Sequence, residues 1–77
     1  MSREAVGKIV SRALQEERFR ALIMDRPYDA VEGYDLEPEE QGALIAGDEL
    51  GLTEMGVDPE TAQRYVGLFR ISRAGGG

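Results

Sequence analysis

Carboxylates are the only side chains in this sequence that occur closely enough together to suggest acid–base chemistry or metal binding. The chain has no histidine and no cysteine. This removes the usual general base, the commonest metal ligand, and any disulfide or thiolate metal site. The acid pairs Glu39-Glu40 and Asp48-Glu49 are neighbours in sequence, and neighbours do not share a helix face. We therefore expect solvated acidic surfaces, and a chain that is not an enzyme.

The remaining polar clusters do not match ligand-binding motifs. Asp25, Asp29, Glu32 and Asp35 lack the Asp-x-Asp-x-Asp-Gly spacing of a calcium loop. The glycines at positions 42, 47 and 51 do not form a phosphate loop, because no lysine follows them and acids surround them. The sequence therefore predicts no catalytic residue, no metal site and no cofactor bound by this chain.

Helix start and stop signals divide the chain into short segments. Prolines at positions 27, 38 and 59 suit the first turns of helices, and Ser2 and Asp58 are expected to be N-caps. The expected helices cover residues 2–15, 16–24, 28–31, 38–46, 49–55, and a last segment from Pro59 to Tyr65 or Val66, where Gly67 interrupts it. The predicted fold is all-α: a compact bundle of five or six short helices followed by an extended C-terminal tail.

Apolar residues at helical spacing define the expected core. The first helix carries an apolar stripe at i, i+3, i+4, i+7 and i+8. The expected core residues are Val6, Ile9, Val10, Ala13, Leu14, Phe19, Leu22, Ile23, Leu44 and Ile45. Tyr28 and Tyr34 are expected to be core or rim aromatics.

The charge is divided unequally along the chain. A length of 77 residues allows one small domain. Residues 1–63 carry a net charge of −9 and residues 64–77 carry +3. The acidic part is unsuited to nucleic acid or an anionic membrane. It suits a partner with a basic docking surface, although the same charge also serves solubility alone. Without a long apolar run or an h-region, we expect a soluble cytoplasmic protein.

The last fourteen residues, RYVGLFRISRAGGG, differ from the rest in having three arginines, no acid and a glycine end. Two interpretations remain open for their apolar residues Val66, Leu68, Phe69 and Ile71. They could form a last helix or strand on the core. Alternatively, because an all-α body offers no sheet edge, an extended segment would need the surface of a partner.

Residues 2–48 resemble small helical domains related to the alpha subunit of extradiol ring-cleavage dioxygenases. The resemblance lies in a helix pair followed by a spaced pattern. In this chain the pattern reads Phe19-Arg20-Ala21-Leu22, Pro27, Ala30, Gly33-Tyr34-Asp35-Leu36 and Glu37-Pro38-Glu39-Glu40. Related domains also serve as leader-like parts of ribosomally made, modified peptides.

The strip Leu68-Phe69-Arg70-Ile71-Ser72, with its glycine-rich end, resembles the core peptide of split borosin precursors. That resemblance implies that residues 1–63 are a recognition domain and residues 64–77 the core peptide. The domain would dock on a separate methyltransferase, in a heterotetramer of two enzyme and two precursor chains. S-adenosylmethionine, bound by the enzyme, would methylate backbone amide nitrogens of the tail. Arg70 and Arg73 depart from the family pattern.

An extended tail would present every second amide to a rigid active site in the same way. Phe69 and Ile71 share one face, so their nitrogens are the expected methylation sites, with Leu68 and Val66 as weaker candidates. The body is expected to fold without the tail, and Glu37, Glu39 and Glu40 are expected to steer docking.

Two other functions remain open. One is a small regulatory subunit of an extradiol ring-cleavage dioxygenase. The other is a precursor for a different maturase. The tail has no cysteine or threonine and one serine, which leaves few acceptors for thioether or azole chemistry.

Overall fold

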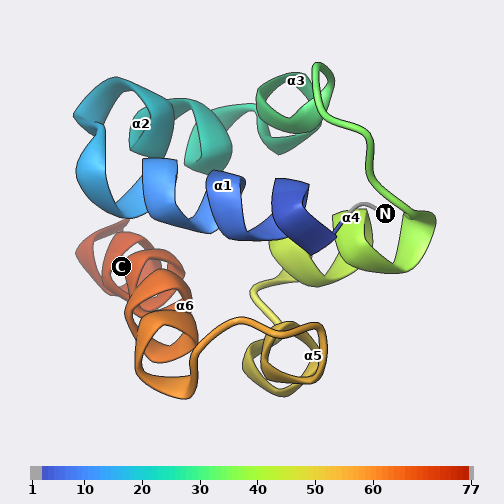
Figure 1. Cartoon of the computed structure of the whole chain (residues 1–77). Helices are drawn as coiled ribbons and strands as arrows, with labels where there is room; N and C mark the ends of the chain where they lie inside the picture. The colour runs from blue at the N-terminus through green and yellow to red at the C-terminus, as the bar shows by residue number, and fades with distance from the viewer. Residues whose placement is uncertain (1–2, 77) are drawn as a thin grey trace.

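The computed structural model describes the backbone of residues 3–76 and the side chains of residues 4–70. The helices are α1 (Arg3–Gln15), α2 (Glu17–Asp25), α3 (Pro27–Val31), α4 (Pro38–Ala46), α5 (Glu49–Glu54) and α6 (Pro59–Gly76) (Figure 1). Residues 3–76 contain no strand. The predicted all-α bundle of five or six helices is confirmed.

Local signals in the sequence set most helix ends. Pro27 and Pro38 each stand in the first turn of a helix. The Asp48 carboxylate accepts a hydrogen bond from the Gly51 amide at 3.1 Å, and the Asp58 carboxylate accepts one from the Thr61 amide at 3.3 Å. These bonds satisfy N–H groups that have no partner within the helix. Gly47 ends α4 with a φ of 68°, a conformation that glycine adopts without steric cost. The expected N-cap Ser2 lies outside the described residues.

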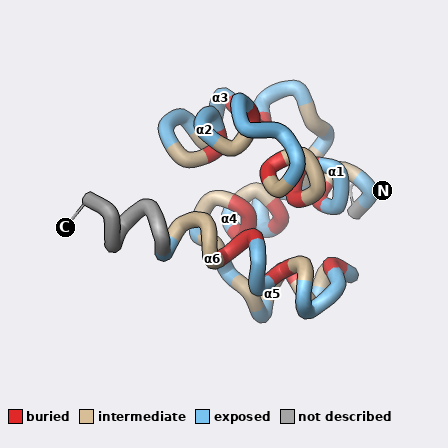
Figure 2. The backbone as a smooth tube through the Cα atoms, turned by 90° about the vertical axis from the view of Figure 1, so that its left-hand side faces the viewer, coloured by how far each residue is buried: buried red, intermediate tan, exposed pale blue. Residues whose placement is uncertain are grey.

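Helix α1 lies in the middle of the bundle and contacts α2, α4 and α6. Its apolar stripe is buried as expected, and so are Phe19, Ile23 and Leu44. Leu14 packs partly buried against the core. In Figure 2 the buried stretches lie towards the middle of the bundle and the exposed stretches on its outside. The prediction was wrong for Leu22, which is 38% exposed, and for Ile45, which is half-buried at the surface of α4.

Helix α6 extends beyond its predicted end. The helix continues through Gly67, so the end predicted at Tyr65 or Val66 is wrong. Tyr65 and Val66 are core residues, and Leu68 and Phe69 pack against that core. The Phe69 ring meets the Tyr65 ring edge-on at 5.1 Å between centroids. The expectation of an extended chain is therefore wrong for residues 67–70, because packing of the side chains on either side of Gly67 outweighs its helix-weakening effect.

Candidate functional site

The C-terminal strip, the candidate substrate, is only partly accessible within the described residues. Val66 is buried, Leu68 and Phe69 are half-buried, and Arg70 is exposed. The amides of Val66, Leu68 and Phe69 all belong to α6, and a helical N–H is bonded to the carbonyl four residues earlier. The side chains of Ile71 and Ser72 lie outside the described residues. Helix α6 runs to Gly76, so the structure places the backbone of all four candidate methylation positions in a helix.

Tyr65 attaches this helix to α4. Its side chain is fully buried, and its hydroxyl donates a hydrogen bond to the Leu44 carbonyl at 2.7 Å. Burial raises the pKa of the Tyr65 phenol above its ordinary value, because the phenolate would lose its hydration. Phe69 lies one turn further on, and its ring is 3.3 Å from where a Cβ on Gly47 would be. Sequence analysis missed Tyr65, although its i+4 spacing to Phe69 was a usable signal.

Phe19 and Tyr34 of the resemblance pattern surround one guanidinium. Arg12 donates two hydrogen bonds to the Glu16 carboxylate, at 3.0 and 3.1 Å, and one to the Tyr34 hydroxyl at 2.7 Å. The same group lies 4.2 Å from the centroid of the Phe19 ring. The Glu16 hydrogen bond, followed by the Tyr34 bond, raises the pKa of Arg12, and the bond from Arg12 lowers the pKa of the Glu16 carboxyl. The cluster joins α1, α2 and the loop after α3.

Arg20, also part of that pattern, caps the C-terminal end of α1. Its guanidinium donates to the carbonyls of Ala13 and Leu14, both at 2.9 Å. Carbonyls in the last turn of a helix have no partner within it, and a cation there also interacts favourably with the helix dipole. These residues of the pattern therefore have structural roles, and none of them needs a ligand to explain its position.

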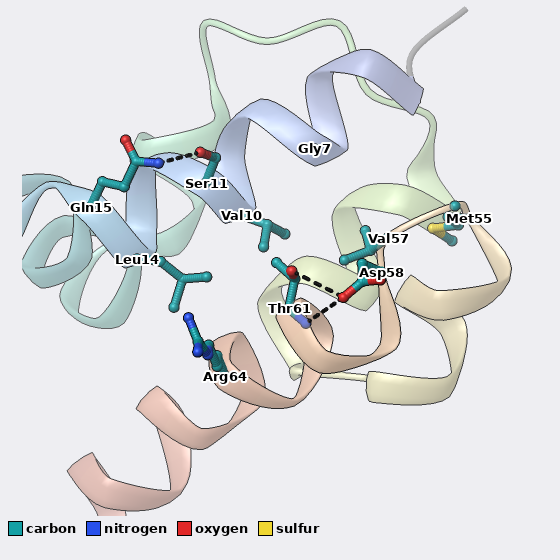
Figure 3. A pocket seen from close by; sticks show the side chains of 11 residues that line it. Gly7, Val10, Ser11, Leu14, Gln15, Met55, Val57, Asp58, Thr61 and Arg64 are labelled. Atoms are coloured by element: carbon teal, nitrogen blue, oxygen red, sulfur yellow. Dashed lines mark hydrogen bonds between the residues drawn. The ribbon is translucent and has the colours of Figure 1, made fainter.

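The groove between α1 and α6 is lined by both helices and by the loop before α6 (Figure 3). Its polar side chains bond to each other. The Asp58 carboxylate accepts from the Thr61 amide and hydroxyl, and Gln15 donates to Ser11 at 3.1 Å. Arg64 lies 3.9 Å from Glu60. These groups stabilise helix ends and faces, and no acid–base pair converges on the groove.

The acid pairs singled out in the sequence are divided between core and surface. Glu40 is buried, and its carboxylate accepts a hydrogen bond from the Glu37 amide at 2.8 Å. The expectation that Glu40 steers docking is therefore wrong. Glu39 is exposed, and Asp48 caps α5. Among the described residues, no group of three or more His, Cys, Asp or Glu could hold a metal ion. In that same part of the chain, no helix is long and apolar enough to cross a membrane.

The outer face of α4 carries two adjoining grooves. One is lined by Tyr28, Pro38, Gln41, Gly42, Ile45 and Ala46. The other is lined by Glu39, Gly42, Ala43, Ala46, Asp48, Gly51, Glu54 and Met55. Both grooves have Gly42 and Ala46 in common. These two small residues form a strip of α4 without large side chains, the low strip, between the grooves. Tyr28, at 66% exposed, stands at one side. Sequence analysis missed this face because it assigned Ile45 to the core.

Comparison with protein families, curated proteins and solved structures found no match to this chain.

Proposed function

We propose that this chain is the precursor of a ribosomally made peptide. Its helical domain docks on a separate S-adenosylmethionine-dependent backbone N-methyltransferase, and its C-terminal segment is the substrate. The resemblance of the strip from Leu68 to Ser72 to split borosin core peptides suggests the reaction. The decrease of burial along α6 is the observation that carries the proposal. Tyr65 is fully buried, Leu68 and Phe69 are half-buried, and Arg70 is exposed. Within the described side chains, contact with the core thus decreases towards Arg70, which supports a C-terminal segment that can leave the bundle for a partner.

The packing of α6 changes the order of the candidate sites. Methyl transfer needs an amide nitrogen free of its helical hydrogen bond. Methylation at Phe69 would require the end of α6 to unwind and the ring to leave Tyr65 and Gly47. Leu68 and Val66 would require still more of the core to open. Ile71 lies nearer the end of α6 than the other three candidates, so its amide needs the shortest stretch of helix to unwind. It becomes the first candidate, with Phe69 second.

The test is co-expression of the chain with a split borosin methyltransferase, followed by tandem mass spectrometry. We expect methyl groups on backbone nitrogens in residues 69–77, and loss of one of them in Ile71→Pro, which has no amide hydrogen. Methyl groups only on side chains, or only before Arg64, would contradict the proposal.

A glycine substitution tests whether α6 must unwind. A Cβ at Gly67 meets no atom within 4 Å, so Gly67→Ala should stabilise the helix by about 1 kcal/mol. If Phe69 is methylated, its rate should fall about fivefold. Gly7→Ala is the matched control, since that position in α1 is equally open. Equal rates in both variants would show that methylation at Phe69 does not need unwinding.

A second candidate is a small helical subunit that covers part of a larger enzyme chain, such as an extradiol ring-cleavage dioxygenase. The packing of Leu68 and Phe69 on the core favours it, because a subunit has use for a last helix that stays packed on its own domain. A stable complex with a dioxygenase catalytic chain, together with an unmethylated tail after co-expression with the methyltransferase, would identify this function.

A further inference from the structure

The charged residues in the middle of the chain are all acidic. Residues 27–63, which form α3, α4, α5 and the start of α6, contain eleven of the fifteen acidic residues and no lysine or arginine. Nearly all of these acids are exposed or half-exposed, with Glu40 the buried exception. In Figure 1, α3, α4 and α5 occupy the right-hand side of the molecule, opposite α2 and the end of α6. One side of the protein thus carries an excess of negative charge, with Arg26 and Arg64 at its edges, 3.9 Å from Asp29 and Glu60 respectively.

The same side also has two surface grooves and exposed apolar side chains. The two grooves on α4 adjoin along Gly42 and Ala46, where the absence of large side chains lets another chain approach the helix closely. Tyr28 and Ile45 offer apolar contacts on one side, and Glu39 and Asp48 offer carboxylates on the other. Tyrosine is a frequent anchor in protein interfaces because it combines apolar area with a hydroxyl. An apolar centre with an acidic rim is suited to an amphipathic, basic segment.

A second copy of this chain fits poorly as the occupant, because several of its cations are already engaged. Arg12 binds Glu16 and Tyr34, and Arg20 binds carbonyls of α1. Arg26 lies 3.9 Å from both Asp25 and Asp29. Residues 1–26 have a net charge of only +2. Residues 64–77 carry +3, but the apolar residues of this segment up to Phe69 pack on the chain's own core, so they are not free to enter the groove of a second copy. The complementary charge is therefore expected from another protein.

We infer that the outer face of α4, bounded by Tyr28 and by the acids before α5, is the docking surface for a basic, amphipathic helix of a partner protein. In the precursor function proposed above, on which this inference rests, that helix belongs to the methyltransferase. The apolar side of the helix lies over Gly42 and Ala46, and its lysines or arginines face Glu39 and Asp48.

Two matched variants test the surface. Ala46→Arg places bulk and positive charge on the low strip of α4, and Ala21→Arg makes the same change at an exposed alanine of α2. The probe is a synthetic amphipathic helical peptide with leucines on one side and lysines on the other, titrated into the isotope-labelled full chain and followed by NMR. We expect amide shifts concentrated at Tyr28, Gly42, Ile45 and Ala46. Ala46→Arg should weaken binding about tenfold or more, and Ala21→Arg should change it less than about twofold.

Three results would overturn the inference. Shifts spread evenly over all exposed acids, or equal weakening by both variants, would mean unspecific charge attraction. Self-association of the chain that Ala46→Arg abolishes would assign the face to a second copy. Shifts centred on the groove between α1 and α6 would place docking there. Both variants must keep the helical circular dichroism of the parent for these comparisons to hold. Their exposed positions favour this.

The same variants separate this inference from the proposed function. If Ala46→Arg is methylated as fast as the parent by the enzyme, docking uses another face and the precursor function stands. If the parent chain binds the peptide at α4 but is never methylated, the docking face stands and the precursor function fails.

Discussion

At the scale of single residues, Arg12 joins α1 to the start of α2 and to the loop after α3. Its guanidinium holds Glu16 with two bonds, donates to Tyr34, and lies over the Phe19 ring. These contacts together need the planar guanidinium of arginine, whose N–H donors point in several directions. Lysine has the positive charge but not this arrangement of donors. The lowered pKa of Glu16 means that its contribution is present above the pKa of the unfolded chain. That contribution is lost as pH falls through the lower folded value.

Arg12→Lys should lower the free energy of unfolding, since it loses the Tyr34 bond and the stacked cation. Urea unfolding followed by circular dichroism measures the loss. Arg18→Lys, at an exposed position of α2, is the control and should change stability by less than about 0.5 kcal/mol. Equal effects in both variants would mean that the contacts of Arg12 contribute nothing beyond its charge.

Tyr65 makes stability depend on alkaline pH. Its folded pKa is raised by burial, whereas a tyrosine in an unfolded chain titrates near pH 10. Its contribution is therefore complete below about pH 10 and is lost as pH rises from there through the folded pKa. Urea unfolding at increasing pH should show this loss. Tyr65→Phe should be less stable at neutral pH by about 1–2 kcal/mol, because the Leu44 carbonyl loses its donor. It should also show a flatter alkaline decline, and an unchanged slope would assign the decline to other groups.

At the scale of helices, the sequence predicted α1 to α5 well because their ends are coded locally. Pro27, Pro38, Gly47 and the aspartates before α5 and α6 each favour one backbone conformation or satisfy free amides. The end of α6 has no such local signal. Gly67 costs about 1 kcal/mol in a helix, and contacts with residues distant in sequence, such as those of Phe69 with Gly47 and of Tyr65 with Leu44, offset it. The candidate substrate was misjudged as extended for the same reason.

Truncation separates the core from the rest of the tail. A chain that ends at Gln63 lacks Tyr65, Val66 and Phe69. Their removal costs several kcal/mol, which is comparable with the whole stability of a domain this small. This shortened chain should lose cooperative thermal unfolding, whereas a chain that ends at Arg70 should keep it. Circular dichroism melting of both proteins tests the prediction. A cooperative melt of the shorter chain at the parent's temperature would mean that residues 1–63 fold without α6, as the sequence alone suggested.

At the scale of the whole molecule, the sequence showed that charge is unequal but not where it lies on the surface. The acidic residues of the middle segment are spread over more than thirty positions, and only the fold brings α3, α4 and α5 to one side. The strip formed by Gly42 and Ala46 could not be predicted either, because an exposed helix face of small residues has no distinct sequence pattern. The strip becomes a surface feature only in the fold, where Tyr28 and α5 lie beside it.

This charge distribution predicts an unusual response to salt. Among the described residues, the Arg12–Glu16 pair is short at 3.0 Å, and the ion pairs of Arg26 and Arg64 are exposed with atoms 3.9 Å apart. Exposed pairs of this kind contribute little, while eleven acids between residues 27 and 63 repel one another without a cation among them. Screening should therefore remove more repulsion than attraction.

The free energy of unfolding should rise by about 1 kcal/mol when sodium chloride is raised from about 0.01 M to about 0.5 M, because the Debye length shrinks from about 30 Å to a few Å. Urea unfolding at each salt concentration measures it. The double variant Glu32→Gln/Asp35→Asn removes two exposed acids before α4, so it should be more stable at low salt and respond less to added salt. If stability instead falls as salt is added, the attractive ion pairs outweigh the repulsion, and the acidic side of the molecule does not cost the fold stability.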